Sequence, residues 1–356
     1  MRAALAGLGE WRPEEIRTND AWPEALVASF RARASGDADD TLVEIPSDPD
    51  DALTLASLAA EARDPFLGTT ARRVAGGTSA ADAETRAARA ALQDARVEAA
   101  SVDVVMSYAL VPDRVAQASA PKIAASLGCG RARAMGVELG CATALAQLEL
   151  ACSLIEAGRA HVVLCTQSHL VSRAVAMSHP VSPNLGDLAT AFVVVAVERA
   201  RPVLVHAVTD GEYHEAVVWA RGRDDASDKP WWQEGGAFYA GTRDPLRAKR
   251  LMRDTVRFAR QTIDELAERA RLDRRDVAVM ASVQPRGWIP SAIAERTGLA
   301  GRSVDTFREL AHVGGCGPVA NLLEARRRGL APSGARAVLY GQGAGFTRAA
   351  ALVTMP

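Results

Sequence analysis

The sequence predicts an α/β protein built from two similar halves that pack face to face, and two internal repeats carry this prediction. Residues 84–110 and 257–285 each have a helix with Ala or Leu on one face, a short link with an aspartate, and an apolar strand. Residues 140–167 and 315–342 each run Gly-Cys, a helix containing Leu-Glu, a glycine, Arg-Ala, a strand and a glutamine. A chain of 356 residues is long enough for two such halves.

We expect the N-terminal half to span residues 1–198 and the C-terminal half to span residues 199–356. Between residues 142 and 155 the only charged side chain is Glu149, so this helix should lie inside the protein. Residues 161–165 have the dense β-branched character of a buried strand. The other expected elements of the first half are a strand over 3–8, a helix over 81–95 and a strand over 102–110.

Composition and charge exclude several classes of protein. The chain is 48% hydrophobic and 24% charged, which is typical of a globular protein with a sizeable core. A net charge of −1 gives no general attraction to nucleic acid or to an anionic membrane, so neither is an expected partner. Five cysteines without CxxC spacing indicate a reducing compartment and argue against a disulfide framework or a zinc site. With no signal-peptide pattern and no apolar stretch of membrane-spanning length, we expect a cytoplasmic protein without a metal or bound cofactor.

Two stretches outside the repeats are irregular. Residues 33–82 contain an acidic run, which we interpret as a solvated surface segment or, alternatively, as the rim of an entrance. In residues 219–241, Trp219, Trp231 and Trp232 either line a substrate mouth or dimer contact, or pack under a long loop. The members of the acidic run are Asp37, Asp39, Asp40, Glu44, Asp48, Asp50 and Asp51.

Cys141 stands where a catalytic thiol is expected. It follows Gly140 at a sharp turn between the extended residues 137–139 and the apolar helix. The positive end of a helix dipole lowers the pKa of a thiol and offers N–H donors to an oxyanion. The alternative is a small buried hydrophobic residue, which is the common role of a cysteine. The other four cysteines fit that ordinary role better: Cys129, Cys152, Cys165 and Cys316.

The order and spacing of five stretches resemble the ketoacyl-ACP synthase III family of the thiolase superfamily, over nearly the whole chain. The resemblance implies a thiolase-like fold, in which two pseudo-repeated α/β halves form a five-layered αβαβα sandwich. It also implies a homodimer and an acyl-CoA or acyl carrier protein (acyl-ACP) as the substrate that supplies the acyl group. The matching stretches are VELGCATALAQLELACSLIEAG (137–158), NLGDLATAFVVVAVE (184–198), DVAVMASVQPRGWIPSAIAERTGL (276–299), AHVGGCGPVANLLEA (311–325) and GQGAGFTRAAALV (341–353).

The resemblance allows the Cys–His–Asn triad of that family to be carried over residue by residue. The acyl-accepting cysteine falls on Cys141. Val283 occupies the position of the family's histidine, and His312 occupies the position of its asparagine. The family's glycine-rich turn falls on residues 343–346. Here Ala344 replaces the middle glycine, whose backbone N–H completes an oxyanion hole with that of Cys141.

Val283 and His312 change the chemistry that the resemblance implies. In the family, neutral His and Asn donors stabilise the enolate formed when a malonyl group loses CO₂, and a valine with an imidazole compromises that role. A thiol with one histidine suits general-base chemistry instead, in which His312 deprotonates Cys141 and then an incoming hydroxyl or amine. This pattern is similar to an ester-forming acyltransferase branch from antibiotic pathways, in which a carboxylate orients the histidine. Asp305 is only a distant candidate for that carboxylate.

Three functions follow from these residues. The first is an acyltransferase of specialised metabolism that moves an acyl group from acyl-CoA or acyl-ACP through Cys141 to a hydroxyl or amine acceptor. The second is a condensing enzyme that forms a carbon–carbon bond between acyl thioesters, with His312 alone as base. The third is a non-catalytic ketosynthase-like partner subunit, which the loss of the histidine at Val283 favours and the retention of Cys141 opposes. The other five histidines have no comparable placement: His161, His169, His179, His206 and His214.

Two groups of residues are candidates for binding the acyl donor. Arg250 and Arg253 belong to a basic stretch over residues 243–260 that either docks an acidic carrier protein or coenzyme A phosphates, or forms a solvated helix face. Arg286 and Trp288 follow the strand that ends at Val283 and are candidates to pair with and stack on an adenine nucleotide.

Overall fold

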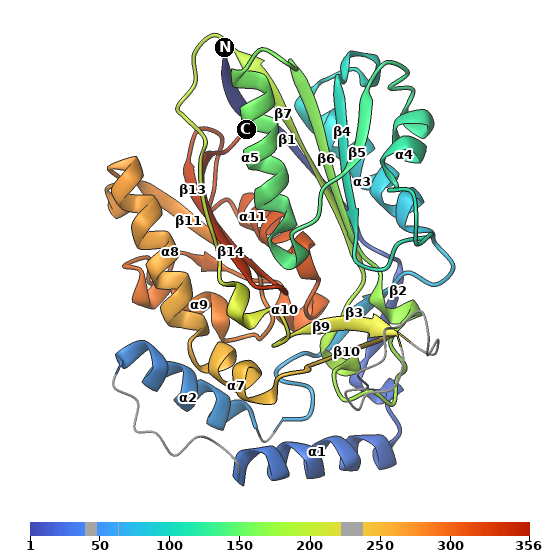
Figure 1. Ribbon diagram of the computed structural model, residues 1–356, viewed down its shortest axis with the longest axis vertical. Coiled ribbons are helices and arrows are strands. Elements are labelled where there is room, and N and C mark those ends of the chain that lie inside the picture. The colour runs from blue at the N-terminus through green and yellow to red at the C-terminus, as the bar shows by residue number, and fades with distance from the viewer. Residues whose placement is uncertain (40–47, 63, 222–237) are drawn as a thin grey trace.

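Within the residues that the computed structural model describes (1–39, 48–62, 64–221 and 238–356), the chain forms two five-stranded mixed sheets on either side of a helical layer (Figure 1). The strand orders are β1-β7-β6-β4-β5 and β12-β11-β13-β14-β8. The strands of the first sheet are β1 (Arg2–Trp11), β4 (Val104–Ala109), β5 (Arg133–Gly136), β6 (Val162–His169) and β7 (Leu188–Val197). Those of the second sheet are β8 (Leu204–Thr209), β11 (Val277–Ser282), β12 (Ser303–Val304), β13 (Arg336–Gly343) and β14 (Thr347–Thr354).

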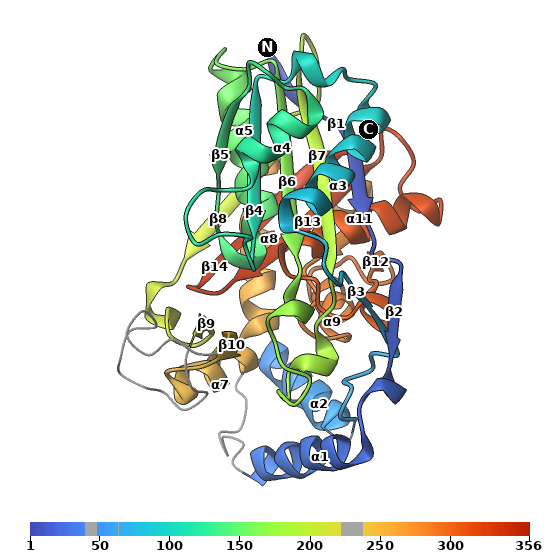
Figure 2. The same cartoon turned by 90° about the vertical axis from the view of Figure 1, so that its right-hand side faces the viewer.

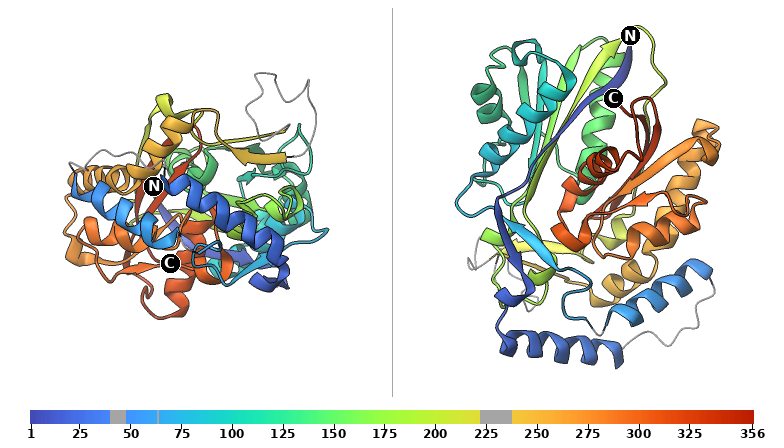
Figure 3. Two further views of the ribbon diagram at one scale, coloured as in Figure 1. Left: turned by 90° about the horizontal axis from the view of Figure 1, so that it is seen from below. Right: turned by 180° about the vertical axis from the view of Figure 1, so that it is seen from behind.

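The helical layer between the sheets consists of α5 (Thr143–Glu156) and α11 (Gly317–Arg327), which the view from behind shows enclosed by the two sheets (Figure 3). Both helices are apolar on most sides, and their residues Leu145 and Leu322 are fully buried in one core with strand residues of both sheets. The prediction that the helix after Cys141 lies inside the protein is therefore confirmed.

Further helices cover the outer face of each sheet. Helices α3 (Ala80–Ala95) and α4 (Ala120–Leu127) lie over the first sheet (Figure 2), and α8 (Thr255–Ala270) and α9 (Ile289–Arg296) lie over the second. In the described part of the chain the layers thus run helix, sheet, helix, sheet, helix. This order confirms the αβαβα sandwich that the resemblance implied.

The strands of the two sheets come from separate parts of the sequence, before and after a link that contains Glu198. The division into residues 1–198 and 199–356 stays our proposal for the two halves. The strand expected over residues 161–165 continues further, to His169. Its last residue, His169, lies against Gly314, two residues after His312.

Helix α2 (Pro49–Glu61) lies outside the sandwich against α7 (Pro245–Arg253), α8 and α9 (Figure 1), and it corrects the interpretation of the acidic run. Asp50 has no exposed surface and forms ion pairs with Arg260 and Arg296. Asp51 is also buried and accepts a hydrogen bond from Arg257 at 3.2 Å. The expectation of a solvated segment is therefore wrong for this part of the run, because its carboxylates and the basic stretch neutralise each other.

The remaining regular elements are peripheral. Trp219, on β9, packs against the small core of Val171, Val175 and Leu185, which agrees with the packing interpretation for this tryptophan. Trp231 and Trp232 lie outside the described residues, as do Asp40 and Glu44. Among the described helices, none combines the length and the apolar composition needed to span a membrane. The peripheral elements are α1 (Glu24–Asp39), α7 (Pro245–Arg253), α10 (Phe307–Leu310), β2 (Glu15–Thr18), β3 (Ala71–Val74), β9 (Val218–Arg221) and β10 (Phe238–Gly241).

Candidate active site

Cys141 lies in a short 3-10 turn, Gly140–Ala142, at the start of α5, and the glycine-rich turn of the second half packs directly against it. Gly140 has a φ of 53°, and a Cβ atom there would lie 3.1 Å from the backbone nitrogen of Ala344. A Cβ atom on Gly343 would lie 2.4 Å from the Leu139 carbonyl oxygen. Two glycines thus allow the turns from the two halves to meet at the cysteine.

His312 comes from the other half of the molecule, and its Nε2 atom lies 3.7 Å from Cys141 Sγ. Backbone hydrogen bonds hold its loop in place. The amide of His312 donates to the carbonyl oxygen of Asn184 at 2.9 Å, and the amide of Gly186 donates to the carbonyl oxygen of His312 at 3.0 Å. The structure therefore brings together the two side chains that the sequence singled out, and both remain partly exposed.

The hydrogen bond on the far side of the His312 ring determines its tautomer. Nδ1 lies 3.1 Å from the backbone carbonyl oxygen of Gln284, which can only accept, so Nδ1 carries the hydrogen. Nε2 therefore presents its lone pair to the thiol of Cys141. The orienting group is thus a backbone carbonyl, whereas the carboxylate of Asp305 accepts a hydrogen bond from the Phe307 amide at 3.2 Å.

The side chain of Gln284 fixes the backbone around that carbonyl. It is fully buried, and its Nε2 donates to the carbonyl oxygen of Ala311 at 3.0 Å and to Thr306 Oγ1 at 3.1 Å. Its Oε1 accepts from the Thr306 amide at 3.0 Å and from Asn321 Nδ2 at 2.8 Å. Ala311, the residue before His312, has a φ of 57°, a strained value for alanine that this network maintains. Gln284 was not predicted as a site residue, although it directly follows Val283, which occupies the position of the family's histidine.

Burial keeps both members of the Cys141–His312 pair neutral. It raises the pKa of the Cys141 thiol to about 12. Burial also lowers the pKa of His312 to about 3, and the neighbouring His169 lowers it further, while the hydrogen bond to Gln284 opposes the shift. The pKa of this thiol is thus raised, not lowered as expected from its place at the helix start, because burial disfavours the thiolate. The neutral thiol is therefore the form that faces His312 Nε2.

The other two positions carried over from the family are Val283 and Ala344. Val283 is buried in the core beneath α9, so no side-chain donor stands at the position of the family's histidine. Ala344 is exposed at the tip of its turn, and its backbone nitrogen lies next to Gly140. Both N–H groups expected in an oxyanion hole, those of Cys141 and Ala344, thus belong to the two turns that meet here.

Comparisons with known proteins agree with this geometry. Residues 135–211 match the family described as 3-oxoacyl-[acyl-carrier-protein] synthase III, and residues 267–355 match its C-terminal part. The chain is thus similar to the 3-oxoacyl-ACP synthase III family around Cys141 and in its C-terminal part. Its relatives include the β-ketoacyl-ACP synthase III of Rhodospirillum rubrum, 28% identical over 290 residues, which cover 78% of this chain and 85% of that protein. A Streptomyces coelicolor synthase III is 28% identical over 294 residues, or 79% of this chain and 84% of the relative.

Solved structures with this fold include the 3-oxoacyl-ACP synthase III of Aquifex aeolicus, with a TM-score of 0.78 at 20% identity over 99% of both chains. A priming β-ketosynthase from a polyketide biosynthetic pathway gives a TM-score of 0.77 at 19% identity, over 100% of this chain and 96% of the other. The resemblance stated from the sequence and its thiolase-like fold are thereby confirmed. At these identities, the solved structures bear on the fold alone.

In this chain, three of the four candidate donor-binding residues contact acidic side chains of the same molecule. Arg286 Nη1 and Trp288 Nε1 lie 3.2 Å and 3.3 Å from Glu61 Oε2, at the end of α2. Arg253 lies 2.7 Å from Asp254 and 3.9 Å from Asp51. The fourth, Arg250, is exposed. The donor-binding residues are thus not one open basic surface, and their role in donor binding stays a proposal.

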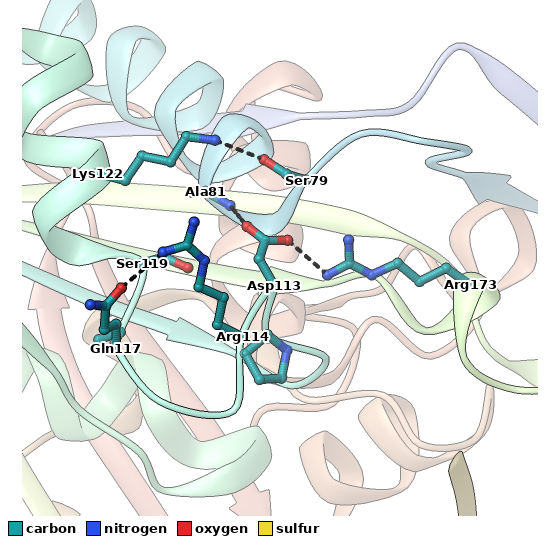
Figure 4. A pocket seen from close by; sticks show the side chains of 10 residues that line it. Ser79, Ala81, Asp113, Arg114, Gln117, Ser119, Lys122 and Arg173 are labelled. Carbon is teal, nitrogen blue, oxygen red and sulfur yellow. Dashed lines mark hydrogen bonds and ion pairs between the residues drawn. The ribbon is translucent and has the colours of Figure 1, made fainter. Parts of the chain in front are cut away.

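A concavity of about 510 Å³ lies away from the cysteine, at the start of α3 (Figure 4). Asp113 occupies its centre, where the carboxylate accepts hydrogen bonds from the Ala80 and Ala81 amides and pairs with Arg173 at 3.2 Å. Neither Cys141 nor His312 lines this concavity.

His169 lies next to His312, although it was not among the residues predicted for the site. Its ring lies 5.5 Å from that of His312, centroid to centroid, in an edge-to-face arrangement. The strand expected to end at residue 165 continues to His169, which brings this ring next to His312. Its position at the end of a buried strand next to the nucleophile's helix is the sequence signal that could have identified it.

Proposed function

We propose that this protein transfers an acyl group from an acyl-CoA or acyl-ACP thioester, through Cys141, to a hydroxyl or amine acceptor. The observation that supports this most directly is the neutral His312 lone pair, which faces the Cys141 thiol across 3.7 Å. A neutral base beside a neutral thiol, in a site with valine at position 283, matches the requirements of acyl transfer.

Loading begins when a thioester carbonyl reaches the sulfur. His312 Nε2 takes the thiol proton as Cys141 Sγ attacks the carbonyl carbon, and the N–H groups of Cys141 and Ala344 stabilise the tetrahedral oxyanion. Collapse releases the donor's thiolate, which receives the proton back from His312. The products are an acyl-Cys141 thioester and a free donor thiol.

The condensing alternative is supported by the names of the relatives, which are β-ketoacyl-ACP synthases. That reaction needs hydrogen-bond donors aimed at an enolate oxygen. Here the hydrogen of His312 is directed at Gln284, and Val283 has none to offer. The site is therefore richer in acceptors than in donors, which favours base catalysis over enolate stabilisation.

Product analysis separates the two reactions. The protein is incubated with acyl thioesters, with a malonyl thioester, and with alcohols and amines, and the products are identified by mass. Ester or amide formation that disappears in Cys141→Ala supports the proposal. Release of CO₂ with a β-keto product establishes condensation instead, and failure of Cys141 to accept any acyl group favours the non-catalytic partner subunit.

We also propose a homodimer that forms through an exposed sheet edge, the mode that the family resemblance implies. Strand β5 is one of the two edge strands of the first sheet in the described chain, and one of its sides has no strand partner there. Light scattering coupled to size exclusion tests this, and a monomer at micromolar concentration contradicts it.

A further inference from the structure

A second imidazole, that of His169, is built into the site next to His312. The side chain is 1% exposed, and its Nδ1 lies 2.8 Å from the carbonyl oxygen of Gly186. Gly314 packs flat against the ring, since a Cβ atom there would come within 2.3 Å of His169 Cδ2. The same Gly186 donates its amide to the His312 carbonyl oxygen, so one residue fixes both histidines.

The second ring nitrogen of His169, Nε2, has no hydrogen-bond partner among the described residues. Because the Gly186 carbonyl can only accept, Nδ1 carries the hydrogen and Nε2 carries a lone pair. Within the described residues, that Nε2 atom is buried and has no hydrogen-bond partner. Buried polar atoms are almost always paired, so this lone pair indicates a donor that is not part of the chain.

The two histidines therefore differ in what they face. The Nε2 atom of His312 faces the Cys141 thiol, whereas the Nε2 atom of His169, whose ring lies 5.5 Å from that of His312, has no partner among the described residues. Burial lowers the pKa of His169 to about 4, so this lone pair is available at neutral pH. A neutral, fixed acceptor is suited to a group with an O–H or N–H, and not to an anion or to a tertiary amine.

We propose that His169 Nε2 binds the hydroxyl or amine of the acyl acceptor and removes the proton of that group as the acceptor attacks. His312 acts as the base for Cys141 during loading. This inference rests on the proposed function and adds a base specific to the second step. It assigns the acceptor to primary and secondary alcohols or amines. It makes His169 a catalytic residue of transfer alone.

The step is balanced without a further reactant. The acceptor's O–H proton moves to His169 Nε2 as its oxygen forms a bond to the acyl carbon. The C–S bond to Cys141 then breaks, and the sulfur leaves as a thiolate. The proton returns from His169 to that sulfur, which leaves an ester, a free thiol and two neutral imidazoles.

The test separates loading from transfer in the full-length protein. The matched variant is His169→Asn, because the asparagine amide can keep the hydrogen bond to the Gly186 carbonyl while the Nε2 lone pair is removed. Loading is followed by intact mass with N-acetylcysteamine thioesters from acetyl to octanoyl. Transfer from the acyl-enzyme is then followed with methanol as the hydroxyl probe. Hydroxylamine is the reference nucleophile, since it attacks without a general base.

We expect His169→Asn to load within about twofold of the wild-type rate and to lose about 100-fold or more in methanolysis, a typical share for a general base. Its reaction with hydroxylamine should stay within about threefold. The exposed His161 provides the control, because His161→Asn should change none of these rates.

Each other outcome has a defined meaning. Unchanged methanolysis in His169→Asn overturns the inference but leaves the proposed function intact. Equal losses in loading and methanolysis also overturn it, because His169 would then act by positioning His312. If the asparagine variant does not fold, His169→Gln replaces it and is judged by the same rates. No acyl-Cys141 in the wild-type protein with any thioester refutes the proposed function itself, and with it the inference.

Discussion

Replacing Gln284 with leucine should both destabilise the protein and slow the loading of Cys141. The leucine fills a similar volume but removes the partners of two buried backbone groups, the Thr306 amide and the Ala311 carbonyl. Asn321 keeps a hydrogen bond to the Ser282 carbonyl at 2.9 Å, so it is not left unpaired.

The expected magnitude follows from those two groups. A buried polar group that loses its partner costs about 1–3 kcal/mol, so two cost about 2–6 kcal/mol, and the added apolar burial of leucine reduces this to about 3 kcal/mol. The loop that holds His312 also loses its anchor at Ala311, and a displacement of about 1 Å from the thiol should slow loading by about 100-fold.

Urea unfolding and the rate of acyl-enzyme formation by intact mass measure the two effects. Gln93→Leu is the matched control, because Gln93 is exposed on α3 and should change stability by less than about 0.5 kcal/mol. If Gln284→Leu leaves both stability and loading at the values of the control, the network does not hold His312 and this part of the account is wrong.

Three further predictions concern charge, packing and pH. Asp50→Asn should cost about 2 kcal/mol in urea unfolding at pH 7, since it removes the buried partner of two arginines whose own partial exposure moderates the loss. Burial alone would raise the pKa of Asp50, but its hydrogen bonds and charge pairs with those arginines lower it. The ionised Asp50 therefore stabilises the folded protein at pH values above the unfolded pKa, and this contribution should fade as the pH falls below about 4. Gly314→Ala should destabilise by about 1–3 kcal/mol, because Gly314 has a φ of 54° and the new Cβ would collide with His169; unchanged stability contradicts the packing described. With a pKa of about 3 for His312 and about 12 for Cys141, the loading rate should be flat between about pH 5 and pH 9 and fall only in strong acid, whereas an inflection near pH 6.5 contradicts the buried neutral pair.

The repeat and the motifs were sufficient to predict the fold and the pairing of Cys141 with His312. The internal repeat indicated two similar layered halves, and a helix with so few charged residues is expected to be buried, so its composition and the repeat together placed α5. The pairing of Cys141 with His312 was implied by the resemblance, because His312 occupies the position of the family's asparagine.

The features that could not be predicted from the sequence depend on contacts between residues far apart in the chain. The carboxylate of Asp50 meets Arg260 across more than two hundred positions, so a run of acids looked solvated. The partner of His312 is a backbone carbonyl, which any residue type supplies, and a search for a carboxylate such as Asp305 could not find it. The pKa of Cys141 depends on burial from every side, whereas the sequence indicated only its place at a helix start.

The most direct measurement of the central claim is the rate at which Cys141 acquires an acyl group in the wild-type protein and in His312→Ala, followed by intact mass with the same thioester. The account predicts one adduct on Cys141 in the wild type and a loading rate about 100- to 10,000-fold lower in His312→Ala. An equal loading rate in the two proteins, or an adduct of the same size in Cys141→Ala, contradicts a thiol activated by that imidazole.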